Sequence, residues 1–116
     1  AALLTTKIPE YKVTKDKEVK ETGKQISLQT KLIPVSITMA LLNNTLIVDP
    51  NSDEEIVMEA RFTLTSAEKN VLCAGQKGVS GGFSPEQIEL AADTALANGE
   101  KIRKIIKKSV EHGKKN

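Results

Sequence analysis

The residues best suited to chemistry in this sequence are carboxylates that lie close together in the chain. Such a group could bind a divalent metal ion or transfer protons. A second interpretation is a short helix, with Ser52 as its N-cap, Glu55 completing a capping box and acids at the positive end of the dipole. We favour this second interpretation and expect no metal ion there. The cluster comprises Asp49, Asp53, Glu54, Glu55 and Glu59.

A basic cluster follows near the end of the chain. Its side chains could contact RNA phosphates, or they could form a solvated helix face that complements the negative end of the dipole. The chain carries a formal charge of only +2, which gives little electrostatic reason for strong nucleic-acid binding. RNA contact is therefore the less favoured alternative. The candidates are Lys101, Arg103, Lys104, Lys107 and Lys108, with Lys114 and Lys115 beyond them.

Other features that could suggest a site have simpler explanations. Cys73 is the one cysteine, which excludes an internal disulfide and is typical of a reducing compartment; we expect it to be a small buried side chain. His112 lies in an expected last helical turn, where a cation complements the dipole. The glycine-rich segment 78–82 lacks the Lys-Ser or Lys-Thr ending of a phosphate-binding loop and is interpreted as a simple loop.

The first pair of strands is predicted around a tight turn. Residues 35–42 alternate so that Val35, Ile37, Met39 and Leu41 share one face. Asn43-Asn44 tolerates the positive φ values of a two-residue hairpin turn, so the apolar run 46–48 is expected to pair back on this strand. Asp49-Pro50 then ends the hairpin, because proline cannot donate a ladder hydrogen bond.

The second half of the chain predicts another strand pair and a long helix. Residues 61–65 and 71–74 form the strands, joined by the turn 66–70. A helix then begins with Ser84 as N-cap, Pro85 in the first position and Gln87 completing a capping box. An apolar stripe is expected to face the core, and Gly99 permits close backbone approach. The stripe comprises Ile88, Ala91 or Ala92, Ala95, Ile102, Ile106 and Val110.

The predicted order is strand, strand, short helix, strand, strand, long helix. This ββαββα order indicates an α+β fold with an antiparallel four-stranded sheet. The lead-in before it is expected to be extended, after the end of a helix at residues 1–5, with a hairpin turning near Lys15-Asp16 or Thr22-Gly23. No apolar run approaches the roughly 20 residues of a membrane span. We also expect the chain to be a fragment of a longer protein.

Four segments carry a resemblance to a known family: LIPVSITMALLNNTLIVDPNSDEE, MEARFTLT, LCAGQKGVSGG and EQIELAADTALANGEKIRKII. They resemble the second domain of ribonuclease PH-like proteins. They are most similar to ring subunits of the RNA exosome in the non-catalytic branch, which includes the archaeal forty-two type and the eukaryotic ribosomal RNA-processing protein forty-three type. The opening AALLTTKIP is similar to that family's junction between its two domains.

The resemblance implies a domain division and a set of partners. Residues 1–32 would form the interdomain junction and lead-in, 33–113 the ribonuclease PH second domain, and 114–116 a basic tail. The family forms hexameric rings in which catalytic-type and non-catalytic-type subunits alternate around a pore for single-stranded RNA, with cap subunits as further partners. The implied location is intracellular: nucleus, nucleolus and cytoplasm in a eukaryote, or cytoplasm in an archaeon. No cofactor and no membrane association are implied.

The resemblance also bears on catalysis. Active members place an aspartate directly after an alanine at the end of the short acidic helix, whereas this sequence has Ala60 followed by Arg61. A guanidinium can neither accept a proton nor bind a metal ion, so we expect a structural subunit that supports 3′-to-5′ RNA and rRNA processing by its partners. The alternatives are an active phosphorolytic exoribonuclease subunit that uses Asp49 and Glu55, and an independent protein-binding module that uses the long helix.

Overall fold

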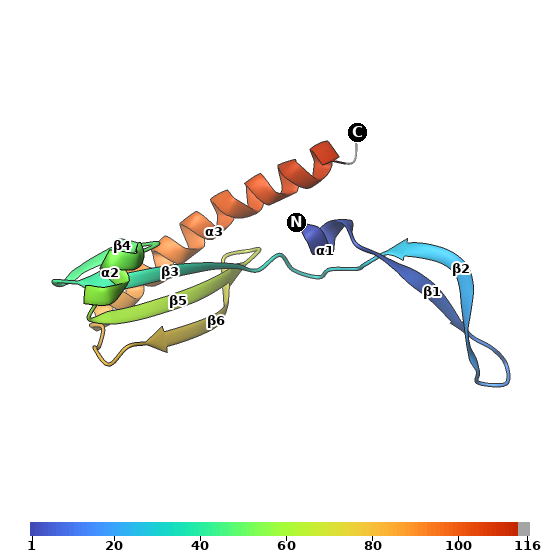
Figure 1. Ribbon diagram of the computed structural model, residues 1–116, viewed down its shortest axis with the longest axis horizontal. Helices are drawn as coiled ribbons and strands as arrows, with labels where there is room; N and C mark the ends of the chain where they lie inside the picture. The colour runs from blue at the N-terminus through green and yellow to red at the C-terminus, as the bar shows by residue number, and fades with distance from the viewer. Residues whose placement is uncertain (114–116) are drawn as a thin grey trace. The chain divides into compact units, whose positions relative to one another are not determined.

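The computed structural model describes residues 1–113 and divides the chain into two compact units (Figure 1). The first unit contains residues 1–31 and the end of the last helix from Ile106. In it, α1 (Ala2–Thr5) precedes an antiparallel hairpin of β1 (Lys7–Val13) and β2 (Val19–Ser27). The hairpin turns between Val13 and Val19, so the prediction of a turn near Lys15-Asp16 is confirmed and the alternative at Thr22-Gly23 is wrong.

The second unit, Leu32–Ile105, contains the predicted ββαββα arrangement. Its strands form one antiparallel sheet in the order β4-β3-β5-β6, and α3 lies across one face of that sheet (Figure 1). The α+β fold class is therefore confirmed. The elements are β3 (Val35–Leu42), β4 (Thr45–Val48), α2 (Ser52–Val57), β5 (Ala60–Ala67), β6 (Val71–Gly78) and α3 (Pro85–Gly113).

The turns of the sheet follow from residue types that accept positive φ. Asn43 and Asn44 have φ values of 44° and 61°, which confirms the predicted two-residue turn between β3 and β4. The turn between β5 and β6 is shorter than predicted, because Ser66 and Ala67 still pair with β6 beyond an irregularity after Thr65. The second strand pair is consequently longer than the sequence pattern indicates.

The core of the second unit lies between α3 and one face of the sheet. The predicted inner face of β3 is confirmed, since Val35, Ile37, Met39 and Leu41 are all buried. From α3, the buried residues are Ala91, Ala95, Gly99 and Arg103, which recur at steps of four. The helix approaches the sheet closely: a β-carbon on Gly99 would lie only 2.0 Å from Ser66 Oγ. On the α3 side, the contact with the sheet is therefore formed mostly by the small residues Ala91, Ala95 and Gly99.

The predicted apolar stripe of α3 is partly wrong. Ala91 and Ala95 are buried as expected, but Ile88 is 46% exposed and Ile102 is 38% exposed. The physical reason is the close approach at Gly99, which turns the small residues toward the sheet and leaves the larger side chains at the margins of the contact. Among residues 1–113, no helix has both the length and the apolar character that crossing a membrane requires.

Candidate functional site

The acidic segment is organised around a helix cap at a different residue from the one predicted. Asn51, not Ser52, is the N-cap of α2, and its Oδ1 accepts hydrogen bonds from the backbone amides of Asp53 and Glu54 at 2.9 and 3.0 Å. The Glu54 carboxylate, not that of Glu55, accepts from the Asn51 amide at 2.8 Å. The capping box is therefore real but shifted by one residue, because Asn51 occupies the extended position before the first helical turn.

Another carboxylate of the acidic cluster is also bound to the backbone. Glu59 Oε1 accepts a hydrogen bond from the Asn43 amide at 2.6 Å, which ties the end of α2 to the β3–β4 turn. Within residues 1–113, no three or more His, Cys, Asp or Glu side chains lie close enough together to hold a metal ion. The geometry of this segment thus matches the capped-helix interpretation.

Arg61 lies near the start of β5, on the sheet face that α3 does not cover. It pairs with Ala40 of β3 on one side and Gly78 of β6 on the other. A β-carbon on Gly78 would lie 3.2 Å from Arg61 Nε and from Nη2, so the guanidinium rests directly over that glycine. Two hydroxyl pairs continue the same face along β3 and β5. They are Ser36–Thr65 and Thr38–Thr63, each with 2.9 Å between the oxygens.

The glycine-rich loop is anchored at its centre. The Gly81 amide donates to the Glu59 carbonyl at 2.9 Å, which fixes the loop against the start of β5. The helix after the loop begins as predicted, since Ser84 Oγ accepts from the Gln87 amide at 3.2 Å and Gln87 Oε1 accepts from the Ser84 amide at 2.8 Å. The Glu86 carboxylate accepts hydrogen bonds from the Ser84 side chain and from the Glu86 backbone amide, and both lower the pKa of Glu86.

The predicted basic cluster on α3 separates into exposed and buried residues. Lys101, Lys104, Lys107 and Lys108 are exposed, whereas only 4% of Arg103 is accessible. Lys104 forms an ion pair with Glu100 at 2.8 Å, and this hydrogen bond and charge lower the pKa of the Glu100 carboxyl. Arg103 is bound to Ser66 inside the unit, so its guanidinium does not belong to the exposed surface. The predicted Lys114 and Lys115 lie outside the described residues.

The two other titratable candidates have different surroundings. His112 Nδ1 lies 3.0 Å from the Lys108 carbonyl in the last turn of α3, where the sequence places it. Cys73 was expected to be buried, but it is exposed. The reason is its position on β6, an edge strand whose residues Val71–Lys77 are all exposed. Its Sγ donates to the Thr65 carbonyl at 3.5 Å.

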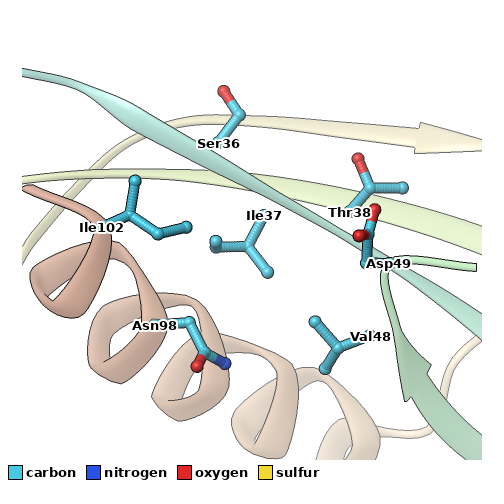
Figure 2. Close-up of a pocket in the computed structure, with 7 residues that line it drawn as sticks. All are labelled: Ser36, Ile37, Thr38, Val48, Asp49, Asn98 and Ile102. Atoms are coloured by element: carbon cyan, nitrogen blue, oxygen red, sulfur yellow. The ribbon is translucent and has the colours of Figure 1, made fainter. Parts of the chain in front are cut away.

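The structure reveals a pocket that the sequence analysis did not find. It has a volume of about 300 Å³ and lies between the first half of β3, the end of β4 and α3 (Figure 2). Asp49 is the only lining residue that the sequence analysis considered as part of a chemical site. Figure 2 shows Thr38 and Asp49 on one side of the space and Asn98 on the opposite side. The lining residues are Ser36, Ile37, Thr38, Val48, Asp49, Asn98 and Ile102.

The second unit of the chain matches a known protein family. Residues 33–98 match the model of the 3′ exoribonuclease family, domain 2. The chain therefore belongs to the 3′ exoribonuclease family and contains its second domain, as the resemblance implied.

Curated relatives and solved structures agree with this assignment. The chain is 40% identical over 111 residues to the exosome complex component Rrp42 of Thermococcus gammatolerans, with 95% of this chain and 41% of the relative covered. It is 37% identical to the component of the same name from Pyrococcus abyssi, with 98% and 42% covered. An archaeal exosome core matches with a TM-score of 0.76 and 25% identity, over 92% of this chain and 40% of that one. The chain thus spans about two fifths of its relatives' length.

Proposed function

We propose that this chain is the second domain of a non-catalytic ring subunit of an exosome, which supports 3′-to-5′ RNA processing and degradation by partner subunits. The similarity to Rrp42 components and to an archaeal exosome core supports the assembly. The observation that carries the non-catalytic role is Arg61, which follows Ala60 where the active members of the resembled family have aspartate. The domain division at residues 32 and 33 belongs to the same proposal.

The chemistry of Arg61 argues against catalysis at that position. Its guanidinium stays protonated, so it neither abstracts a proton nor binds a divalent metal ion. The Glu54 carboxylate is already bound to the Asn51 amide of the helix cap, and the Glu59 carboxylate is bound to the Asn43 amide of the β3–β4 turn. These groups stabilise the fold around the position rather than replace a missing acid.

The alternative enzyme would use Asp49 and Glu55, and the geometry gives it little support. Asp49 lines the pocket beside α3, whereas Glu55 is an exposed residue of α2 that does not line that pocket. A general acid and base must both reach the reacting group within hydrogen-bond distance. The structural role in a ring is therefore the better-supported function.

Partners supply the rest of the function in this proposal. Catalytic-type ring subunits would cleave RNA, cap subunits would bind the ring, and RNA would contact this chain mainly in the assembled complex. The exposed lysines Lys101, Lys104, Lys107 and Lys108 are the candidates for such contact. With a formal charge of +2, the chain alone has little non-specific attraction for RNA. The similarity to archaeal proteins favours the cytoplasm as the location.

Assembly can be tested with a chimera in which this chain replaces the second domain of the Thermococcus gammatolerans relative. Mixed with the catalytic-type ring subunit of that organism, the chimera should elute as one complex on size exclusion, because obligate interfaces commonly bury roughly 2,000 Å² or more. Filter binding should then show tight RNA binding by the complex and weak binding by the chimera alone. A chimera that stays apart from the partner but binds RNA tightly would contradict the proposal.

A further inference from the structure

Strand β4 ends before it has covered the whole edge of β3. Its last paired residue is Val48, opposite Met39, and the Asp49 amide adds one more hydrogen bond to the Thr38 carbonyl at 2.9 Å. Asp49 then has a φ of 57°, a left-handed conformation, and Pro50 follows it. These residues turn the chain out of the sheet and leave the start of β3 without a neighbour on that side.

The open part of this edge presents unpaired backbone groups at Ser36. Backbone groups of alternate residues in a strand point to the same side, and the Thr38 carbonyl points toward β4. The Ser36 amide and carbonyl therefore point the same way, where the described residues provide no strand. The close hydroxyl pair of Ser36 and Thr65 agrees with this, because side chains approach closely at positions whose backbone groups are not bonded to each other.

The pocket lies beside this open edge and contains uncovered apolar surface. Ile37 forms its floor, while Val48 is 44% exposed and Ile102 is 38% exposed. Figure 2 shows Ile37 between Ile102 and Val48, with the Asn98 amide on the α3 side. A volume of about 300 Å³ falls at the lower end of roughly 300–1,000 Å³ for ligand sites. The apolar part of the lining, which comes from Ile37, Val48 and Ile102, suits an aliphatic side chain.

Asp49 gives the rim of the pocket a negative charge. Its side chain is exposed, and it takes part in neither the Lys20–Glu18 nor the Lys104–Glu100 ion pair. A phosphate-bearing ligand would be repelled by this carboxylate, whereas a lysine or arginine side chain would complement it.

We propose that this open edge of β3 and the adjoining pocket form a docking site for an extended segment of another protein. The segment adds a strand that pairs with Ser36, inserts an aliphatic side chain between Ile37 and Ile102, and places a lysine or arginine against Asp49. Side chains two residues apart lie on the same face of a strand, so the motif is a cation two positions from the aliphatic residue. This inference does not depend on membership of an exosome.

An isotopically labelled sample of the 116-residue chain can be titrated with the acetylated peptide Lys-Thr-Ile-Thr-Lys and followed by NMR. The lysine on each side of the isoleucine allows either strand direction. Saturable shifts of the Ser36 amide and the Asn98 side-chain amide are expected, with a dissociation constant below about 1 mM. A peptide methylated on its three central backbone nitrogens should bind at least tenfold more weakly, because it loses its ladder donors.

Variants of the chain test the pocket and the charge separately. Asp49→Asn retains a residue that tolerates positive φ and should weaken binding about fivefold, as expected for an exposed ion pair of about 1 kcal/mol. Ile102→Ala should weaken binding through lost apolar contact. Asp93→Asn removes a carboxylate from an exposed position of α3 outside the pocket and should change binding less than twofold.

The proposal is overturned if the Ser36 amide resonance does not shift when the lysine peptide is added at several times the expected dissociation constant of about 1 mM. Equal binding of the methylated peptide, or of a peptide with glutamates in place of lysines, would also overturn it. The same applies if an oligouridine RNA shifts Ser36 and Asn98 while the lysine peptide does not. That result would assign the pocket to a nucleic acid instead of a protein segment.

Discussion

Arg103 Nη1 donates hydrogen bonds to both the carbonyl and the hydroxyl of Ser66, at 2.7 and 3.1 Å, and thereby joins α3 to the end of β5. Ser66 is itself fully buried and donates its hydroxyl to the Ala95 carbonyl at 3.3 Å. The guanidinium of Arg103 is therefore buried between α3 and the sheet, although the sequence pattern assigns Arg103 to a solvated face of the helix. It fixes the position of α3, and with it the α3 side of the pocket.

Replacing Arg103 with alanine should destabilise the second unit by about 1–3 kcal/mol, because a buried charge-assisted hydrogen bond is lost and the Ser66 carbonyl is left without this donor. Urea unfolding followed by circular dichroism measures the change. Lys101→Ala removes a cation from an exposed position of the same helix and should change stability by less than about 0.5 kcal/mol. Equal effects of the two substitutions would show that Arg103 does not hold the helix in place.

The contact between Gly99 and Ser66 predicts an unusual response to a helix-favouring substitution. Gly99→Ala should gain up to about 1 kcal/mol in helix propensity, yet we expect a net loss of about 1–3 kcal/mol because the new β-carbon overlaps Ser66 Oγ. Gly82→Ala is the control, since a β-carbon there meets nothing within 4 Å. Thermal unfolding that shows a more stable Gly99→Ala protein would mean that α3 lies further from the sheet.

The cap of α2 distinguishes the observed register from the predicted one. Asn51→Ala removes the acceptor for two backbone amides and should cost about 1 kcal/mol. Ser52→Ala should change the free energy of unfolding by less than about 0.5 kcal/mol, because Ser52 is the first helical residue and provides no cap. If chemical denaturation showed a larger loss of stability for Ser52→Ala than for Asn51→Ala, Ser52 would be the N-cap instead.

The start of α3 makes a prediction about pH. The Ser84 hydroxyl, followed by the Glu86 backbone amide, lowers the pKa of Glu86 below its ordinary value of 4.5. The carboxylate therefore adds stability above pH 4.5, and this contribution is lost as the pH falls through the lowered pKa of the folded state. Carboxyl carbon NMR should show that Ser84→Ala raises the pKa of Glu86 while the lowered pKa of Glu100 stays unchanged, because Lys104 causes the latter. An unchanged Glu86 titration would contradict this assignment.

Local signals in the sequence were sufficient to predict most of the fold. The Asn43-Asn44 turn and the capping box of Ser84 and Gln87 depend on neighbouring residues alone, and the structure confirms both. The alternation of β3 likewise identifies its buried face, because strand side chains alternate regardless of what covers them. These features need no knowledge of long-range contacts.

The arrangement of α3 and the pocket could not be predicted in the same way. The buried residues Ala91, Ala95, Gly99 and Arg103 do recur at steps of four, but larger apolar residues such as Ile102 dominate the sequence pattern. The deciding factor is the close approach of Gly99 to Ser66, which is a long-range contact. The pocket depends in turn on where β4 ends, on the left-handed conformation of Asp49 and on Asn98 from a distant part of the chain.

The most direct test of the central claim is RNA phosphorolysis by the reconstituted ring of the chimera and its catalytic-type partner. Release of nucleoside diphosphates from single-stranded RNA is measured in phosphate buffer with Mg²⁺. We predict that substituting asparagine for the partner's catalytic aspartate abolishes release, while Asp49→Asn together with Glu55→Gln in this chain leaves the rate unchanged. Release that survives the partner substitution and is lost with Asp49→Asn and Glu55→Gln would contradict the account and identify this chain as a catalytic subunit.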